Sequence, residues 1–137
     1  MRQRQWLMVV SMGLLLAGRT VDAHHSFAAE FDATKPVTLR GTLVKMEWIN
    51  PHGWLHVAVK QPDGTILNWM GETGAPNALL RRGWTKETLE AGIELVLEGY
   101  LAKNGTRKMT AMTVLLPNGN KLFAGSSGIG APVEPPK

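Results

Sequence analysis

Apolar and polar residues alternate with a period of two in much of the chain that follows residue 36. Over residues 36–48 this pattern predicts a long strand with Val44, Met46 and Trp48 on one face. Gly41 lies within the same strand and is a candidate for a β-bulge, because glycine in a strand often marks one. The first predicted element is therefore a strand with one apolar face.

Residues 50–53, Asn-Pro-His-Gly, are typical of a turn between two strands. Pro51 has a fixed φ and Gly53 permits a positive φ, so the chain can reverse here. The reversal is expected to bring Trp48 near Trp54.

A second strand follows this turn, because Leu55, Val57 and Val59 alternate with Trp54, His56 and Ala58. The Gln-Pro-Asp-Gly sequence over residues 61–64 is a strong turn signal, and residues 65–70 continue as a third strand. The three strands predict an antiparallel meander.

The pattern changes over residues 71–92, which connect the meander to the rest of the domain. Pro76 at the start and Gly83 at the end predict a short helix over residues 76–83. Thr85 is a candidate N-cap of a second helical turn. We therefore expect two short helices in this connection.

Two more strands are predicted over residues 93–102 and 107–116, joined by the type I′ turn that Asn104-Gly105 favours. Residues 121–123 are a candidate for a short last strand. The order strand-strand-strand-helix-strand-strand predicts a mainly β protein, a small five-stranded OB-like barrel with a short helical insertion. A flat sheet with a helix on one face is the alternative, because pattern alone does not show closure.

The N-terminus has the layout of a secretory signal peptide over residues 1–23. Two arginines precede an apolar stretch over residues 6–16 that is too short to span a bilayer, and small or modest residues at 21–23 resemble a cleavage site. Cleavage there would make His24 the mature N-terminus. A cut after Gly18 and an uncleaved anchor are the alternatives.

These signals divide the chain into four parts. The signal peptide is followed by a polar N-terminal segment over residues 24–35, which fits either a helical turn or an extended chain. Residues 36–124 form the predicted domain. Residues 125–137 are rich in Gly, Ser and Pro, so we expect a disordered tail. No transmembrane segment is expected after signal cleavage.

Charge and composition argue against a nucleic-acid partner. The formal charge of +4 falls to +2 without residues 1–23, because these hold three arginines and one aspartate. The remaining cations are spread among acidic residues, whereas a nucleic-acid groove needs a concentrated stripe. The chain has no cysteine, which excludes disulfides and thiol chemistry.

Several short blocks occur in order between residues 24 and 125: His24-His25-Ser26-Phe27, Phe31-Asp32, Gly41-Thr42-Leu43, Glu47-Trp48, Asn50-Pro51-His52, Trp69, Pro76-Asn77-Ala78-Leu79-Leu80-Arg81-Arg82-Gly83-Trp84 and Lys121-Leu122-Phe123-Ala124-Gly125. Together they resemble the DUF6152 family of exported bacterial proteins. The resemblance implies export to the Gram-negative periplasm and a small β-barrel domain. It implies no activity, so no catalytic residue follows from it.

Tryptophan and histidine residues gather around the 50–53 turn and suggest a ligand surface. Tryptophans on a barrel face can stack against a sugar, another ring or an extended peptide, although they also serve as core and rim packing. We expect a non-enzymatic periplasmic binding module for an unknown small molecule or periplasmic protein. Its candidate ligand residues are Trp48, His52, Trp54, Asn77, Arg81 and Trp84.

The four histidines, His24, His25, His52 and His56, suggest an alternative function in metal binding. The amine and imidazole of an N-terminal His24 form a chelating pair, His25 adds a second imidazole, and such ligands suit copper or zinc. His52 or His56 would complete the site if the segment folds back over the turn. A mobile chain end, a turn residue and a packed strand residue explain the same histidines without a metal.

A third group brackets the helical insertion: Asn68, Glu72 and Asn77, beside Arg81 and Arg82. An acid with two cations near a cleft can bind a carboxylate or phosphate, but such residues also cap helices and pair on surfaces. No nucleophile and base pair, paired carboxylates or phosphate-binding glycine loop stands out. An enzyme is therefore the third hypothesis.

Overall fold

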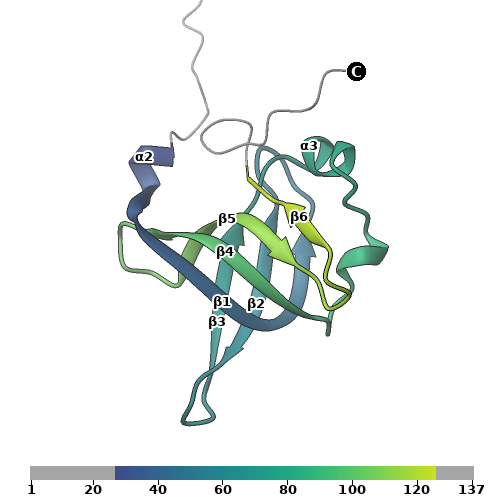
Figure 1. Ribbon diagram of the computed structural model, residues 1–137. Coiled ribbons are helices and arrows are strands. Elements are labelled where there is room, and N and C mark those ends of the chain that lie inside the picture. The colour runs from purple at the N-terminus through teal and green to yellow at the C-terminus, as the bar shows by residue number, and fades with distance from the viewer. Residues whose placement is uncertain (1–26, 126–137) are drawn as a thin grey trace, which may run out of the picture.

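The computed structural model describes residues 27–125 of the 137-residue chain (Figure 1). The predicted signal peptide, His24 and His25, and the tail beyond residue 125 lie outside the described residues. Within residues 27–125, no helix has the length and apolar character needed to cross a membrane.

The domain is mainly β, with short helices at its periphery. The strands are β1 (Phe31–Glu47), β2 (Trp54–Lys60), β3 (Ile66–Glu72), β4 (Glu94–Ala102), β5 (Lys108–Leu115) and β6 (Lys121–Phe123). The helices are α2 (Phe27–Glu30), α3 (Pro76–Arg81) and the single 3₁₀ turn η2 (Glu87–Leu89). The predicted order of strands and helices is confirmed, and the candidate last strand forms as β6.

The strands form a six-stranded sheet in the order β3-β2-β1-β4-β5-β6, and strands that are adjacent in this order pair antiparallel. β3 also pairs with β5 in parallel, from Met70 opposite Lys108 to Glu72 opposite Thr110. This additional pairing joins five strands, β1 to β5, into a near-closed ring. A flat sheet is therefore wrong for this chain, because its outer strand β3 returns to β5.

The inner side of the ring holds the hydrophobic core. Leu55 and Val57 on β2 are fully buried, as are Leu97 on β4 and Val114 on β5. The residues between them on the same strands face outward and are less buried, which is the period of two expected for a half-buried sheet. The alternation predicted for the second strand is confirmed.

Strand β1 departs from its predicted pattern in the middle. The register with β2 shifts between Leu43 and Lys45, so Val44 is bulged and half of its surface is exposed. Leu43 is buried instead, and the extra residue returns Met46 to the inner side. Placing Val44 on the apolar face was therefore wrong. The bulge is not at Gly41, where a Cβ would lie 2.5 Å from the Ala58 carbonyl oxygen and glycine permits close strand approach.

The connection between β1 and β2 also differs from expectation in one respect. It runs over residues 48–53 and contains a cis peptide bond between Asn50 and Pro51. Gly53 does not adopt a positive φ. Glycine is needed there because a Cβ would lie 2.6 Å from Thr73 Oγ1 and 2.7 Å from Met46 Cε.

The helical connection follows its sequence signals. Pro76 is in the first turn of α3, and Gly83 ends it with a φ of 87°. The residue at the N-cap of η2 is Lys86 rather than the predicted Thr85, although Thr85 Oγ1 accepts a hydrogen bond from the Thr88 amide within this turn. Both short helices of this connection are confirmed.

The N-terminal segment combines the two predicted alternatives. Phe27 begins the single turn α2, and from Phe31 the chain continues as strand β1, five residues earlier than the alternation indicated. The Phe27 ring lies 5.6 Å from Tyr100 on β4 and 6.0 Å from Phe31. These contacts place α2 beside the β4–β5 turn, across the ring from α3 (Figure 1).

Candidate functional site

The tryptophans near the 48–53 connection have different neighbours. Trp84 follows α3, is fully buried and donates its indole N–H to the Phe123 carbonyl at 3.1 Å. Trp48 packs edge-on against Trp84 at a ring distance of 6.5 Å. Trp54 instead lies on the outer side of β2, because Leu55 beside it faces the core. The structure therefore brings Trp48 and Trp84 together in packing, while Trp54 contributes to the surface.

Trp54 lies in a polar outer surface that strands β2, β3 and β5 share. Its cross-strand neighbour on β3 is Glu72, and the ammonium of Lys108 on β5 lies 5.2 Å from the centre of its ring. The same ammonium lies 5.8 Å from the Phe31 ring and 3.2 Å from Glu30 Oε2. We call Trp54, Glu72 and Lys108, with His52 and Glu30 at the rim, the Trp54 face.

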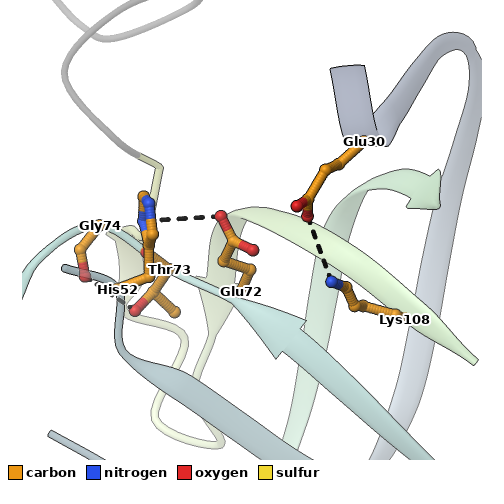
Figure 2. A network of polar contacts seen from close by, with 6 residues as sticks. All are labelled: Glu30, His52, Glu72, Thr73, Gly74 and Lys108. Atoms are coloured by element: carbon orange, nitrogen blue, oxygen red, sulfur yellow. Dashed lines mark hydrogen bonds and ion pairs between the residues drawn. The ribbon is translucent and has the colours of Figure 1, made fainter. Parts of the chain in front are cut away.

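The His52 side chain reaches this face from the 48–53 connection. Its Nδ1 lies 3.2 Å from the Thr73 carbonyl oxygen and 3.5 Å from Glu72 Oε1 (Figure 2). Both of these neighbours are acceptors, so Nδ1 carries the hydrogen and donates it. In the tautomer with its hydrogen on Nδ1, the ring has a lone pair on Nε2, and this atom is buried with no hydrogen-bond partner among the described residues.

The contact between His52 and Glu72 is more buried than the ion pair between Glu30 and Lys108. The two side chains are only 14% and 11% exposed, whereas Glu30 and Lys108 are 29% and 28% exposed. Figure 2 shows Glu72 between His52 on one side and the Glu30–Lys108 pair on the other. Charges that are partly shielded from water interact more strongly, so this face can orient a polar or charged ligand.

His56 belongs to a separate pair on the outer side of β1 and β2. Its Nε2 lies 3.2 Å from Glu47 Oε2, an ion-pair distance without aligned hydrogen-bond geometry. Lys45 bonds the same carboxylate. The Lys45 ammonium, and to a smaller extent the His56 ring, lower the pKa of the Glu47 carboxyl below its usual range. His56 and His52 thus have different acidic partners.

Metal ligation by histidine stays a prediction. Among residues 27–125 no three His, Cys, Asp or Glu side chains are grouped so that they could hold a metal ion. His24 and His25 lie outside the described residues. His52 has the feature expected of a ligand, since its Nδ1 is fixed and the Nε2 lone pair is free.

The polar residues of the predicted third group have the following surroundings. Asn77 and Arg81 are exposed on this helix, and Asn68 is exposed on β3. Arg82 donates to the Gly125 carbonyl at 2.6 Å, and its guanidinium lies 4.7 Å above the Phe123 ring. Glu72 lies against His52. Glu72 and Arg82 therefore have different neighbours.

Three residues of the described surface were not predicted as site residues from the sequence. Glu30, Lys103 and Lys108 looked like ordinary charges dispersed along the chain, yet α2 and the β4–β5 turn bring them together around a pocket of about 200 Å³. The signal was the Asn104-Gly105 turn, which places the lysines before and after it at one edge of the sheet.

Comparison with known proteins adds a family but no activity. The chain matches a family described as a family of unknown function, DUF6152, over residues 13–111. A search of curated proteins finds no match. The match covers well over half of the chain and nearly all of β1 to β5, although it ends before the block at residues 121–125. The chain therefore belongs to the DUF6152 family of unknown function.

Proposed function

We propose that the protein is an exported, non-enzymatic binding module of the periplasm, and that its ligand binds on the Trp54 face. The observation that supports this most is the position of Trp54. A large aromatic side chain lies outside the core, with an ammonium over its ring and a carboxylate beside it. Tryptophan in such a position supplies a stacking surface for a sugar, another ring or a peptide.

The proposal includes an OB-like barrel as the scaffold. The parallel β3–β5 pairing and the connection by α3 between β3 and β4 support this assignment. In OB-folds the second and third strands carry the ligand face, together with the loop between the first and second strands. Trp54 and Glu72 come from these strands and His52 comes from this loop. These positions support the Trp54 face as the ligand face of the proposed OB-like barrel.

The ligand itself is a small molecule or a periplasmic protein rather than a nucleic acid. The mild charge of the mature chain supports this. Of the ligand residues predicted from sequence, His52 and Trp54 belong to the Trp54 face. Trp84 is fully buried, so its part in the proposal is to hold the scaffold.

The test is retention of a ligand by the mature protein. Immobilised wild type, Trp54→Ala and His52→Ala are incubated with periplasmic extract, and the bound compounds and proteins are identified by mass spectrometry. The control is Ile66→Ala, which removes a side chain that is 64% exposed at the far end of the β2–β3 hairpin.

A compound or protein retained by wild type and by Ile66→Ala, but not by the two face variants, would support the proposal. Circular dichroism must show that all variants are folded. Equal retention by wild type and both face variants would refute it.

The second candidate function is metal binding by the mature N-terminal His24, with His25 and His52 or His56 as further ligands. The observation that favours His52 is its buried Nε2 without a hydrogen-bond partner in the described part of the chain. A hydrogen bond from Nδ1 to a carbonyl or carboxylate is the usual support for a histidine that ligates copper or zinc through Nε2.

Calorimetric titration with Cu(II) and Zn(II) separates this candidate from the first. The samples are the protein with a free His24 amine, a form with one extra alanine before His24, and His52→Ala. Tight binding that is lost in both altered forms would establish the site. Equal binding in all three samples, or none, would exclude it.

A further inference from the structure

A small pocket separates α2 from the β4–β5 turn. It has a volume of about 200 Å³ and is lined by Ala29, Glu30, Ala102, Lys103, Asn104 and Lys108. Pockets for whole drug-sized ligands measure about 300–1,000 Å³. This pocket therefore has room for one functional group of a ligand, or for a small ion with its hydration water.

The hydrogen-bonding groups of the pocket are mostly donors. Lys103 Nζ donates to the Ala28 carbonyl and Lys108 Nζ donates to Glu30, which uses one of the three N–H groups of each ammonium. Asn104 Oδ1 accepts from the amide and hydroxyl of Thr106, so the side-chain amide of Asn104 keeps its two N–H groups for another partner. Several donors thus remain for a ligand that brings acceptors.

The charge of the pocket favours the same kind of ligand. Two ammonium groups and one carboxylate line it, so its formal charge is positive. Lys103 and Lys108 each make a bond at the pocket edge, which restricts their side chains and reduces the entropy lost when they bind a ligand. Charge-assisted hydrogen bonds from an ammonium to a carboxylate or phosphate oxygen are among the stronger ones in proteins.

We propose that this pocket binds an anionic group, a carboxylate or a phosphate, through Lys103, Lys108 and the side-chain amide of Asn104. Lys108 also covers the Trp54 ring at 5.2 Å, so the pocket adjoins the Trp54 face. An anionic ligand held here can lay a ring over Trp54. This last step rests on the proposed function, whereas binding of the anion alone does not.

The experiment is a titration followed by nuclear magnetic resonance of the ¹⁵N-labelled protein. Sodium phosphate and sodium acetate are added separately at constant ionic strength, with sodium chloride as the compensating salt. The readouts are the side-chain amide of Asn104 and the backbone amides around it. Lys103→Gln and Lys108→Gln remove one charge each, and Lys60→Gln is the control because Lys60 is an exposed lysine on β2.

We expect saturable shifts of the Asn104 signals in wild type and Lys60→Gln, and affinity lower by about tenfold in Lys103→Gln and Lys108→Gln. The anion that binds with the higher affinity, phosphate or acetate, identifies the preferred group. Equal affinity in all four proteins, or shifts that do not saturate, would overturn the proposal.

A second arm separates the pocket from the proposed function. Trp54→Ala is titrated with inorganic phosphate or acetate and with benzoate or phenyl phosphate. Unchanged affinity for the simple anions with weaker binding of the ring-bearing anions supports both proposals. Equal affinity for the ring-bearing anions in wild type and Trp54→Ala overturns the ligand position on the Trp54 face and leaves the anion pocket in place.

Discussion

Replacement of Trp84 and of Trp54 by alanine should have very different effects on stability, although sequence patterns assigned both residues to one surface. Trp84 is fully buried and bonds the Phe123 carbonyl, so its removal leaves a cavity and an acceptor without its donor. Truncation of a buried tryptophan costs about 3–5 kcal/mol. Trp54 is only partly buried, and the loss of its contact with Lys108 adds about 0.5–1 kcal/mol.

The difference is large in relation to the total stability of a domain of this size, which is about 5–15 kcal/mol. For Trp84→Ala we expect the melting temperature to fall by roughly 12–40 °C, since each kcal/mol corresponds to about 4–8 °C in a small domain. Trp54→Ala should lower it by less than about 10 °C. Thermal and urea unfolding followed by far-UV circular dichroism avoids the change in tryptophan fluorescence.

An intermediate variant separates the two contributions to the Trp84 effect. Trp84→Phe keeps most of the apolar contact but removes the N–H donor, so it should cost about 1–3 kcal/mol. Comparable losses for Trp54→Ala and Trp84→Ala would refute the division between a packed Trp84 and a surface Trp54.

Two further predictions concern the sheet. Gly99→Ala should destabilise the domain strongly, because a Cβ there would overlap the Thr110 carbonyl oxygen and approach Met109 Cε to 2.9 Å. Gly71→Ala should destabilise it less, since the closest contact of a Cβ there is the movable end of the Leu97 side chain at 3.2 Å. Equal urea midpoints for the two variants would contradict this prediction. Glu98 has a pKa lowered by Lys121 and then by Thr113, so its contribution to stability is present above the usual carboxyl pKa and is lost as the pH falls through the lowered value. Glu98→Gln should therefore reduce stability at pH 7 and narrow its difference from wild type at pH 3, and a constant difference between these pH values would argue against the pair.

The strand pattern was readable where burial alternates without interruption. Leu55, Val57 and Val59 face the core as predicted, because β2 has no irregularity along its length. The bulge at Val44 could not be located from sequence, since an extra residue reverses the facing of every position after it and leaves no compositional mark. Strand existence was thus predictable, while the facing of β1 required the pairing itself.

The candidate site was harder to predict from the sequence than the strands, because its residues come from distant parts of the chain. Tryptophan suits a core, a rim and a binding surface equally well, so composition did not separate Trp84 from Trp54. The proposed anion pocket depends on α2 lying against the β4–β5 turn, and residues 30 and 103 are far apart in the chain. His52 was identified correctly as a turn residue, but its pairing with Glu72 depends on the position of β3.

Two of the blocks that resemble the DUF6152 family meet at the rim near α3. Trp84 bonds the Phe123 carbonyl, Arg82 bonds the Gly125 carbonyl, and both contacts join the helical connection to the last strand. These contacts stabilise the scaffold and do not depend on which ligand the protein binds. Trp54, Lys103 and Lys108 lie outside the blocks, whereas His52 lies within one of them. Under the proposed function, a member of the family with a different residue at the place of Trp54 should therefore keep this fold but not retain the ligand proposed for the Trp54 face.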